Sequence, residues 1–229
     1  MRPIGLLTIG QSPRPDIEPA LAGILGADVP LVCEGALDGL SSEGLGELAA
    51  PAGRAGIETR LADGSTLVMR KDALPSLLRA AVARLPSDVR LAAYLCTGEL
   101  PDIGREGLLL LDSGALLHGT VAAAAQGQRL GVISLPSDLA EAPESWARHD
   151  PEALYAAADP YGDGPPVAEA ARELADSGAT LLVLDCMGFG ARHQAEAARG
   201  SGLPVICPTV VLGHALAALT APVPERHAR

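Results

Sequence analysis

Residues 89–98 read VRLAAYLCTG, and residues 180–188 read TLLVLDCMG. Each stretch is a short apolar run that ends in small and polar residues, which is typical of a strand buried on both faces of a parallel sheet. Each run also leads to a cysteine with a glycine two positions later, Cys96 with Gly98 and Cys186 with Gly188. The two halves of the chain therefore close a buried strand with the same C-x-G motif.

Two further matches extend this repeat outward, in the same order. Residues 5–9 read GLLTI and residues 131–135 read GVISL, and each leads to a serine. Later in each half, a strand-like run precedes an alanine-rich segment in which a histidine adjoins a glycine, at His118 and at His214. Three matches in one order predict two similar half-domains.

Short runs rich in Val, Leu and Ile alternate with alanine-rich segments of helical length along the whole chain. This alternation predicts an α/β fold built on mainly parallel sheets flanked by helices. Strands are expected at 4–9, 29–33, 89–95, 108–111, 130–135, 154–157, 180–184 and 205–207. Helices are expected at 16–25, 74–85, 116–126, 167–177 and 211–219, and a hairpin within 57–70 is expected to turn at Asp63-Gly64.

Charge and hydropathy exclude several partners. The 229 residues hold 28 acidic and 17 basic side chains, a formal net charge of -11, with no cluster of basic residues. Such a surface repels phosphate backbones, so nucleic acid is not an expected partner. No apolar run approaches the ~20 residues of a membrane helix, and the apolar start of the chain is interpreted as a strand rather than a signal peptide. We therefore expect a cytoplasmic protein without a membrane partner.

No metal or cofactor is expected. The four cysteines form no C-x-x-C pair, and the five histidines lack the spacing of metal ligands. Lys71 is the only lysine, and its position where a helix begins predicts a solvated first-turn residue rather than the Schiff-base lysine that a pyridoxal enzyme requires.

Cys96 and Cys186 are expected to share one cleft. Ligands of parallel sheets bind outside the carboxyl ends of the strands, and both cysteines follow such ends. If the halves face each other through a pseudo-two-fold axis, the two sulfurs point into one cleft between them. Cys33 and Cys207 lie within apolar strands and are interpreted as structural.

Three segments resemble the AroM family: 7–16, LTIGQSPRPD; 34–38, EGALD; and 184–189, LDCMGF, which Arg192 and His193 follow. The resemblance covers nearly the whole chain. The family is similar to the aspartate/glutamate racemase superfamily, which includes hydantoin racemases, maleate isomerases and arylmalonate decarboxylases. The resemblance implies two pseudo-symmetric halves, chemistry without a cofactor, and a catalytic cysteine from each half or, in some branches, from one.

Two features of the chain bear on how far the resemblance extends. Racemases of the superfamily commonly have Cys-Asn-Thr in the first half and Gly-Cys-Thr in the second, where this chain has CTG at 96–98 and DCMG at 185–188. Whether one or both cysteines act therefore stays open. The superfamily chain crosses between its halves and returns, which implies a first half-domain of residues 1–115 plus the C-terminal helix at 213–229, and a second of residues 116–212.

Proton transfer next to a carboxylate gives the candidate residues their roles. A cofactor-free enzyme needs a base on one face of the carbon and an acid on the other, and Cys96 and Cys186 are the candidates. Helix N-termini after the strands are expected to lower the pKa of their thiols. Asp185 is expected to be a structural hydrogen-bond acceptor. Residues expected to bind the substrate are Gly10, Gln11, Ser12, Arg14, Thr97, Gly98, Met187, Gly188, His193 and Thr209.

Two of these residues have an alternative interpretation that we weigh equally with substrate binding. Arg14 either pairs with a substrate carboxylate or is a surface charge, and His193, on an expected helix after Cys186, either serves the site or is solvated.

The leading functional hypothesis is a cofactor-independent racemase or isomerase that acts on a small carboxylate such as an amino acid. A decarboxylase or a cis-trans isomerase that relies mainly on Cys186 is the second, and a non-catalytic protein that binds small carboxylates is the third. A homodimer is left open as the oligomeric state.

Overall fold

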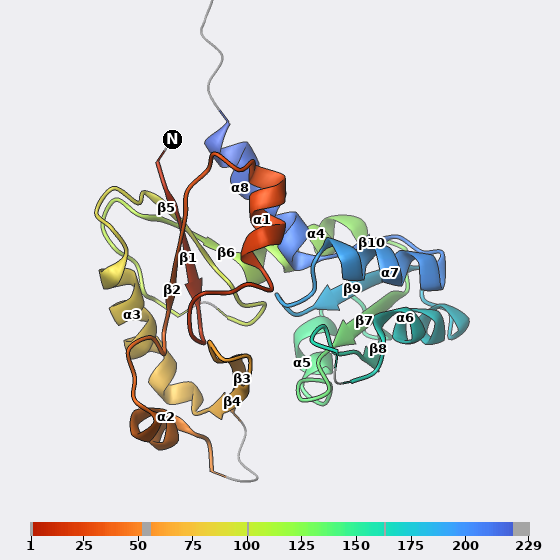
Figure 1. Cartoon of the computed structure of the whole chain (residues 1–229). Helices are drawn as coiled ribbons and strands as arrows, with labels where there is room; N and C mark the ends of the chain where they lie inside the picture. Colours follow the sequence, from red (N-terminus) through yellow and green to blue (C-terminus); the bar gives the residue numbers. More distant parts are fainter. Residues whose placement is uncertain (1, 52–55, 100, 163, 222–229) are drawn as a thin grey trace, which may run out of the picture.

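Two four-stranded parallel sheets form the centres of two half-domains in the computed structural model, which describes residues 2–51, 56–99, 101–162 and 164–221 (Figure 1). The first sheet has the strand order β2-β1-β5-β6 and the second the order β10-β9-β7-β8. Their strands are β1 Ile4–Thr8, β2 Leu31–Gly35, β5 Leu91–Tyr94, β6 Leu109–Asp112, β7 Leu130–Ser134, β8 Leu154–Ala157, β9 Leu181–Asp185 and β10 Val205–Ile206. The predicted α/β fold with two half-domains is confirmed.

Helices cover the sheets, and one hairpin stands apart from them. The helices are α1 Glu18–Leu25, α2 Ser42–Leu48, α3 Leu74–Arg84, α4 Ser113–Ala124, α5 Ala142–Trp146, α6 Val167–Asp176, α7 Ala191–Ser201 and α8 Pro208–Thr220, with a 3₁₀ helix η1 at Lys71–Ala73. The antiparallel hairpin consists of β3 Ile57–Arg60 and β4 Thr66–Met69, and it turns at the predicted Asp63-Gly64. Among the described residues, no helix is both long and apolar enough to cross a membrane.

The predicted elements are all present, and their bounds shift by at most three residues. The last helix starts at Pro208 rather than at 211 because proline suits a first helical turn. Helices α2 and α5 were not predicted from the sequence. Neither shows a helical apolar stripe, since α2 has two glycines and no buried residue, and α5 is only five residues long.

Packing between neighbouring strands explains why both halves of the repeat have a glycine at the matching positions Gly5 and Gly131. These glycines occupy matching places in β1 and β7, the central strands of the two sheets, and both strands are buried throughout. A Cβ atom at Gly5 would lie 2.9 Å from the Cβ of Ala92, and one at Gly131 would lie 2.6 Å from Leu182 Cδ2. Since a side chain at either position would overlap a neighbouring strand, each half needs a glycine there.

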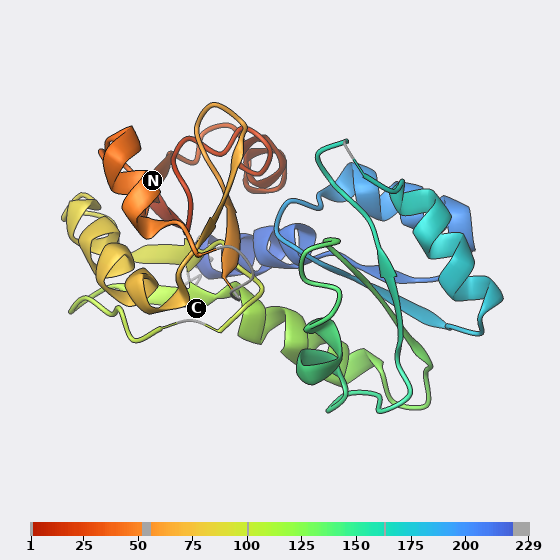
Figure 2. The ribbon, with the colours of Figure 1, turned by 90° about the horizontal axis from the view of Figure 1, so that it is seen from below.

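Two helices join the half-domains. Helix α4 leads from β6 into the second half, and α8 returns to pack on α1 (Figure 2). Leu212 and Leu216 of α8 share one apolar cluster with Ile17 and Leu21. The predicted boundaries at 115/116 and 212/213 fall inside these two helices and stay a prediction, and residues 222–229 of the predicted first half-domain lie outside the described part of the chain.

The contact between α8 and α1 predicts that two helix glycines respond oppositely to alanine. A Cβ at Gly213 would lie 2.6 Å from Ile24 Cδ1 and 3.2 Å from its Cβ, whereas one at Gly119 of α4 would meet nothing within 4 Å. We expect Gly213→Ala to lower the free energy of unfolding by about 1–3 kcal/mol through overpacking. The matched control Gly119→Ala should raise it by about 0.5–1 kcal/mol because alanine favours helices. Urea denaturation checks both, and equal shifts would contradict the packing.

Candidate active site

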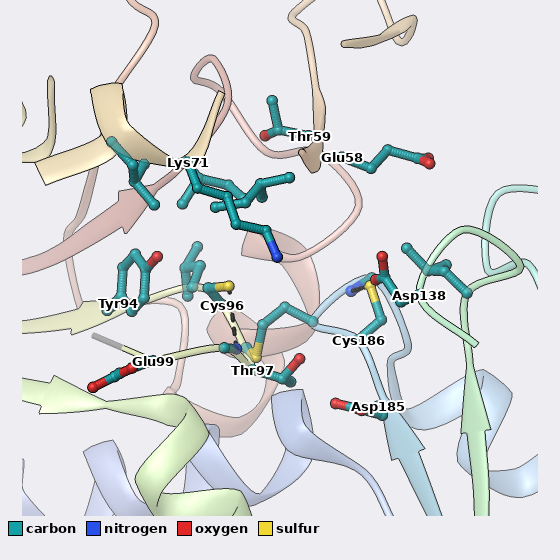
Figure 3. Close-up of a pocket in the computed structure, with 18 of the residues that line it drawn as sticks. Glu58, Thr59, Lys71, Tyr94, Cys96, Thr97, Glu99, Asp138, Asp185 and Cys186 are labelled. Carbon is teal, nitrogen blue, oxygen red and sulfur yellow. Dashed lines mark hydrogen bonds between the residues drawn. The ribbon is translucent and has the colours of Figure 1, made fainter. Parts of the chain in front are cut away.

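A cavity of about 650 Å³ lies between the half-domains at the carboxyl ends of the strands. Cys96 follows β5 and Cys186 follows β9, and both line this cavity (Figure 3). The loop after each strand contributes the rest of its motif, Thr97 with Gly98 on one side and Met187 with Gly188 on the other. The structure thus brings the two C-x-G motifs together around one space.

The two motifs hold their sulfurs in the same way. The Gly98 N–H donates to Cys96 Sγ at 3.3 Å, and the Gly188 N–H donates to Cys186 Sγ at 3.4 Å. A Cβ at Gly188 would lie 2.5 Å from the Tyr161 hydroxyl. Glycine at this position therefore lets the backbone approach both the sulfur and the tyrosine, which explains the third residue of the second motif.

The expected lowering of the thiol pKa values is not found, and this expectation is corrected. Burial raises the pKa of Cys96, and it raises the pKa of Cys186 to about 12. Helix α7 begins only at Ala191, so four residues separate Cys186 from the helix N-terminus that was expected to stabilise a thiolate. Both cysteines are therefore neutral thiols at neutral pH in the ligand-free protein.

Different groups oppose the effect of burial at each sulfur. The Gly188 N–H and then the positive charge of Arg14 lower the pKa of Cys186, whereas the Gly98 N–H and then a hydrogen bond from Tyr94 lower that of Cys96. Tyr94 is the last residue of β5, is fully buried and also lines the cavity. A cation thus supports the second cysteine, and a neutral hydroxyl supports the first.

Asp185 connects the two motifs beneath the cavity. Its carboxylate accepts a hydrogen bond of 2.7 Å from the indole N–H of Trp146, as expected for a structural acceptor. Burial raises the pKa of Asp185, while the hydrogen bond with Trp146 and the nearby hydroxyl of Thr97 lower it. Thr97 belongs to the first half and Asp185 to the second. Although a strand position before Cys186 predicts a side chain that points away from the cysteine, Asp185 also lines the cavity.

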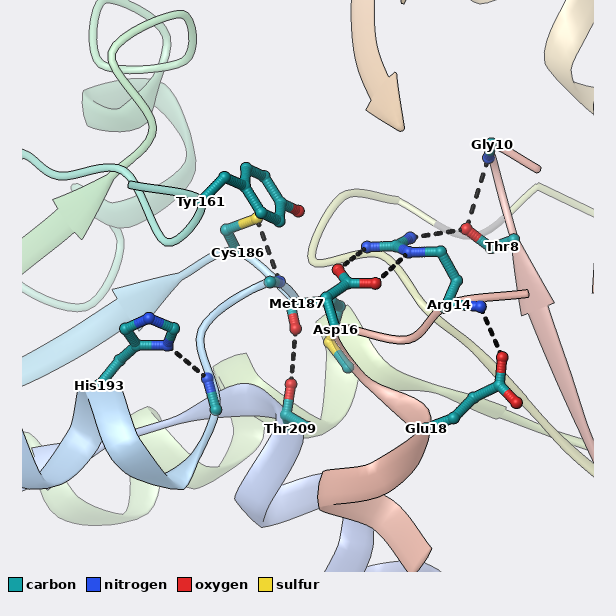
Figure 4. Close-up of polar contacts among 12 residues, drawn as sticks. Thr8, Gly10, Arg14, Asp16, Glu18, Tyr161, Cys186, Met187, His193 and Thr209 are labelled. Carbon is teal, nitrogen blue, oxygen red and sulfur yellow. Dashed lines mark hydrogen bonds and ion pairs between the residues drawn. The ribbon is translucent and has the colours of Figure 1, made fainter. Parts of the chain in front are cut away.

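Arg14 lines the cavity, and each of its three guanidinium nitrogens already has a partner in the protein (Figure 4). Its Nε and Nη2 atoms bond to the two carboxylate oxygens of Asp16 at 2.9 and 2.6 Å, and Nη1 donates to Thr8 Oγ1 at 2.8 Å. Only 5% of the residue is exposed, so it is not a surface charge. The bidentate partner is a carboxylate of the protein, and Arg14 acts on Cys186 through its field.

Three predicted binding residues after β1 support the cavity from outside its lining. Ser12 donates from its N–H and its hydroxyl to Asp38, both at 2.8 Å. Gln11 accepts from the N–H of Ala62 at 3.0 Å, and a Cβ at Gly10 would overlap the carbonyl oxygen of Arg60. Gly10 and Gln11 therefore hold the β3–β4 hairpin against the first sheet, and Ser12 ties the loop after β1 to the loop after β2. A direct contact of these residues with substrate stays a prediction.

Thr209 and His193 likewise lie outside the lining and hold the loop after Cys186. Thr209 Oγ1 donates to the Met187 carbonyl at 2.7 Å, and His193 Nδ1 accepts from the Gly190 N–H at 3.1 Å (Figure 4). Both side chains are buried. His193 is therefore not the solvated helix residue of its alternative reading, and burial lowers its pKa.

Sequence reasoning missed the charged residues that face the cavity from the hairpin and from η1. Lys71 Nζ lies 3.0 Å from Glu141 Oε2, so an ion pair joins the two half-domains. The guanidinium of Arg60 lies 3.9 Å from the centre of the Tyr161 ring, also from one half to the other. Lys71 is half-exposed, yet it lines the cavity rather than facing only bulk water. The sequence held one clue to these residues: the hairpin segment within 57–70 matches no segment of the second half among the described residues.

His118 is a further lining residue that the repeat had marked only as a landmark. Its Nδ1 lies 3.0 Å from His149 Nε2, and its ring centroid lies 4.2 Å from that of Trp146. Burial and the charge of Arg148 lower the pKa of His118 to about 4. This imidazole is therefore neutral at physiological pH and adds no positive charge to the cavity.

Comparison with known proteins places this fold among racemases, isomerases and a decarboxylase. A sequence model of the AroM protein family matches residues 4–220. No curated protein matches the chain in sequence. A crystal structure of arylmalonate decarboxylase is similar, with 14% identity, a TM-score of 0.59 and coverage of 99% of this chain and 98% of that one.

Two further solved structures are similar over most of their lengths. The maleate isomerase Iso of Pseudomonas putida S16 has 15% identity, a TM-score of 0.56 and coverage of 96% of this chain and 94% of that one. Glutamate racemase of Aquifex pyrophilus has 13% identity, a TM-score of 0.54 and coverage of 95% and 84%. At these identities the likeness concerns the fold.

The raised thiol pKa predicts how Cys186 reacts with iodoacetamide. Because its pKa is about 12, the thiolate fraction should increase about tenfold per pH unit from pH 7 to pH 10, and the alkylation rate should follow it without a plateau. Mass spectrometry of the modified peptide measures this rate. Cys207, which is fully buried, is the control and should stay unmodified in the folded protein. A plateau below pH 9 would mean that Cys186 is already a thiolate.

Proposed function

The chain belongs to the AroM protein family, and from that premise we propose that it is a cofactor-independent enzyme that moves a proton at a carbon beside a carboxylate. Cys96 and Cys186 are the acid and the base in this proposal, and the reaction is a racemisation or a related isomerisation. The observation that carries it is the pair of matching motifs, each with a glycine N–H on the sulfur, on either side of one cavity.

The proton balance of this reaction requires unequal protonation of the two thiols. One sulfur, as a thiolate, takes the proton from the substrate carbon and leaves an enolate-like charge on the carboxylate. The other sulfur, as a thiol, returns a proton to the opposite face and becomes the thiolate. Because both thiols are neutral in the ligand-free protein, one must lose a proton before turnover. Cys186 is the better candidate, since Arg14 favours its charged form.

The same asymmetry supports a second candidate function. Arg14 acts on Cys186, whereas the hydrogen bond from Tyr94 to Cys96 involves no cation. A site with one activated thiol suits a decarboxylase, in which a single acid protonates the carbanion left by CO₂, or a cis-trans isomerase that adds one thiolate to a double bond. In both alternatives Cys186 does the chemistry, and Cys96 shapes the cavity.

Single cysteine variants separate these functions. In deuterium oxide, a two-base racemase should incorporate deuterium at the substrate carbon of either enantiomer, and Cys186→Ser or Cys96→Ser should abolish racemisation, about a 10³-fold loss or more. A one-cysteine enzyme should lose activity in Cys186→Ser and be only impaired in Cys96→Ser. NMR of candidate amino acids measures the exchange.

The matched control is Cys33→Ser, because Cys33 lies in β2 and does not line the cavity. This variant should keep full activity. Full activity in Cys186→Ser would contradict a catalytic role for this thiol. Binding of a ligand without any exchange in the wild-type protein would leave a non-catalytic binding protein as the better description.

A further inference from the structure

The cavity has an excess of negative charge in its lining. Three cationic side chains face it, Arg14, Arg60 and Lys71, and His118 is neutral. Six carboxyl groups face it as well: Glu58, Glu99, Asp102, Asp138, Glu141 and Asp185. A substrate with two carboxylates would add to this excess, which is unfavourable because like charges repel across a partly enclosed space.

Two of the three cations already have partners within the protein. Arg14 already forms a bidentate ion pair with Asp16, and both side chains are largely buried. Arg60 covers the Tyr161 ring with the face of its guanidinium, and its Nη2 would lie 3.5 Å from a Cβ at Gly64, at the turn of the hairpin. This stacking places Arg60 in the part of the lining that Tyr161 occupies.

Lys71 is the cation that can exchange its partner. Its ion pair with Glu141 is exposed on both sides, with 51% and 58% of the side chains accessible. Exposed pairs of this kind contribute about 0–1 kcal/mol, so a bound carboxylate can replace Glu141 at little cost. Figure 3 shows Lys71 Nζ pointing toward the space between Cys96 and Cys186. Lys71 thus offers a place for one carboxylate, close to the thiols.

Carboxyl groups gather on the Cys186 side of the cavity. Asp138 follows β7 and lies beside Cys186, and Glu58 reaches toward the same region from β3 (Figure 3). Burial, with the charges of Asp185, Glu58 and Glu141, raises the pKa of Asp138. The only side-chain bond to Asp138 in the described residues comes from Ser137, at 3.2 Å. A cation placed here would relieve the mutual repulsion of these groups.

We propose that the substrate carries one carboxylate, received by Lys71, and a cationic nitrogen, received by Asp138 and Glu58. This inference rests on the proposed function and specifies its substrate class as zwitterionic or cationic amino acids rather than dicarboxylates. An ammonium group on the reacting carbon also helps the chemistry, because its charge stabilises the carbanion formed when the proton leaves. When the substrate displaces Glu141 from Lys71, a further carboxylate becomes available to the cationic nitrogen.

Four compounds with the same five-carbon skeleton test the charge requirement: ornithine, norvaline, glutamate and glutarate. Binding to the wild-type protein is measured at constant ionic strength by thermal shift and by protection of Cys186 from iodoacetamide. We expect ornithine and norvaline to bind, glutamate to bind more weakly, and glutarate to bind at least about tenfold more weakly than norvaline. Glutarate binding as tightly as norvaline, or binding by none of the four, would overturn the proposal.

Variants assign the two charges to their residues. Asp138→Asn should reduce the preference for norvaline over glutarate about tenfold, and Lys71→Gln should weaken both compounds, with recovery in Lys71→Arg. Glu43→Gln is the matched control, because Glu43 is an exposed residue of α2 outside the cavity lining and should leave the preference unchanged. An unchanged preference in Asp138→Asn would contradict the assignment of the cationic site.

The binding and exchange experiments distinguish a failure of the inferred ligand class from a failure of the proposed function. Preferential binding of norvaline without deuterium incorporation into any substrate would reject the proposed function and keep the inferred ligand class. Deuterium incorporation into glutarate in preference to norvaline would keep the proposed function and reject the inferred ligand class.

Discussion

The register of two adjacent parallel strands is the constraint on which the candidate site depends. In the first half β1 pairs with β5, and in the second β7 pairs with β9, each pair in parallel and each with a glycine near the start of its central strand. Without a Cβ at Gly5 and Gly131, the neighbouring strands pack closely enough to bury both faces. Parallel strands end at one edge of their sheet, so the residues that follow β5 and β9 emerge where the halves meet.

That shared edge makes the two cysteines equivalent in position but not in electrostatics. Each sulfur accepts a glycine N–H, yet only Cys186 lies in the field of Arg14, whose own donors are held by Asp16 and Thr8. Asp185, held by Trp146 and close to Thr97, connects the motifs below the cavity. The symmetric frame therefore supplies the placement of the thiols, and buried polar contacts outside it place the positive charge of Arg14 near only one of them.

The hairpin adds the second asymmetry. Among the residues that the structure describes, it is present in the first half alone, and the chain from β3 to η1 brings Glu58, Arg60 and Lys71 to the second half. The Lys71–Glu141 pair is exposed and individually weak. These three residues close one side of the cavity with charges that can change partners.

The sequence by itself determined the two-half α/β fold, most element bounds and the placement of Cys96 and Cys186, because burial periodicity and an internal repeat are local properties of the chain. It also marked Gly10, Gln11, Ser12 and Arg14 as part of the site. Whether these side chains face a ligand or the protein is set by tertiary contacts, here with Ala62, Asp38 and Asp16. Only the tertiary structure decided that the thiol pKa values are raised rather than lowered, since burial outweighs the nearby N–H donors, and that Lys71 faces Glu141 across the cavity. Electrostatics depends on distances between residues far apart in the chain, and folding alone sets those distances.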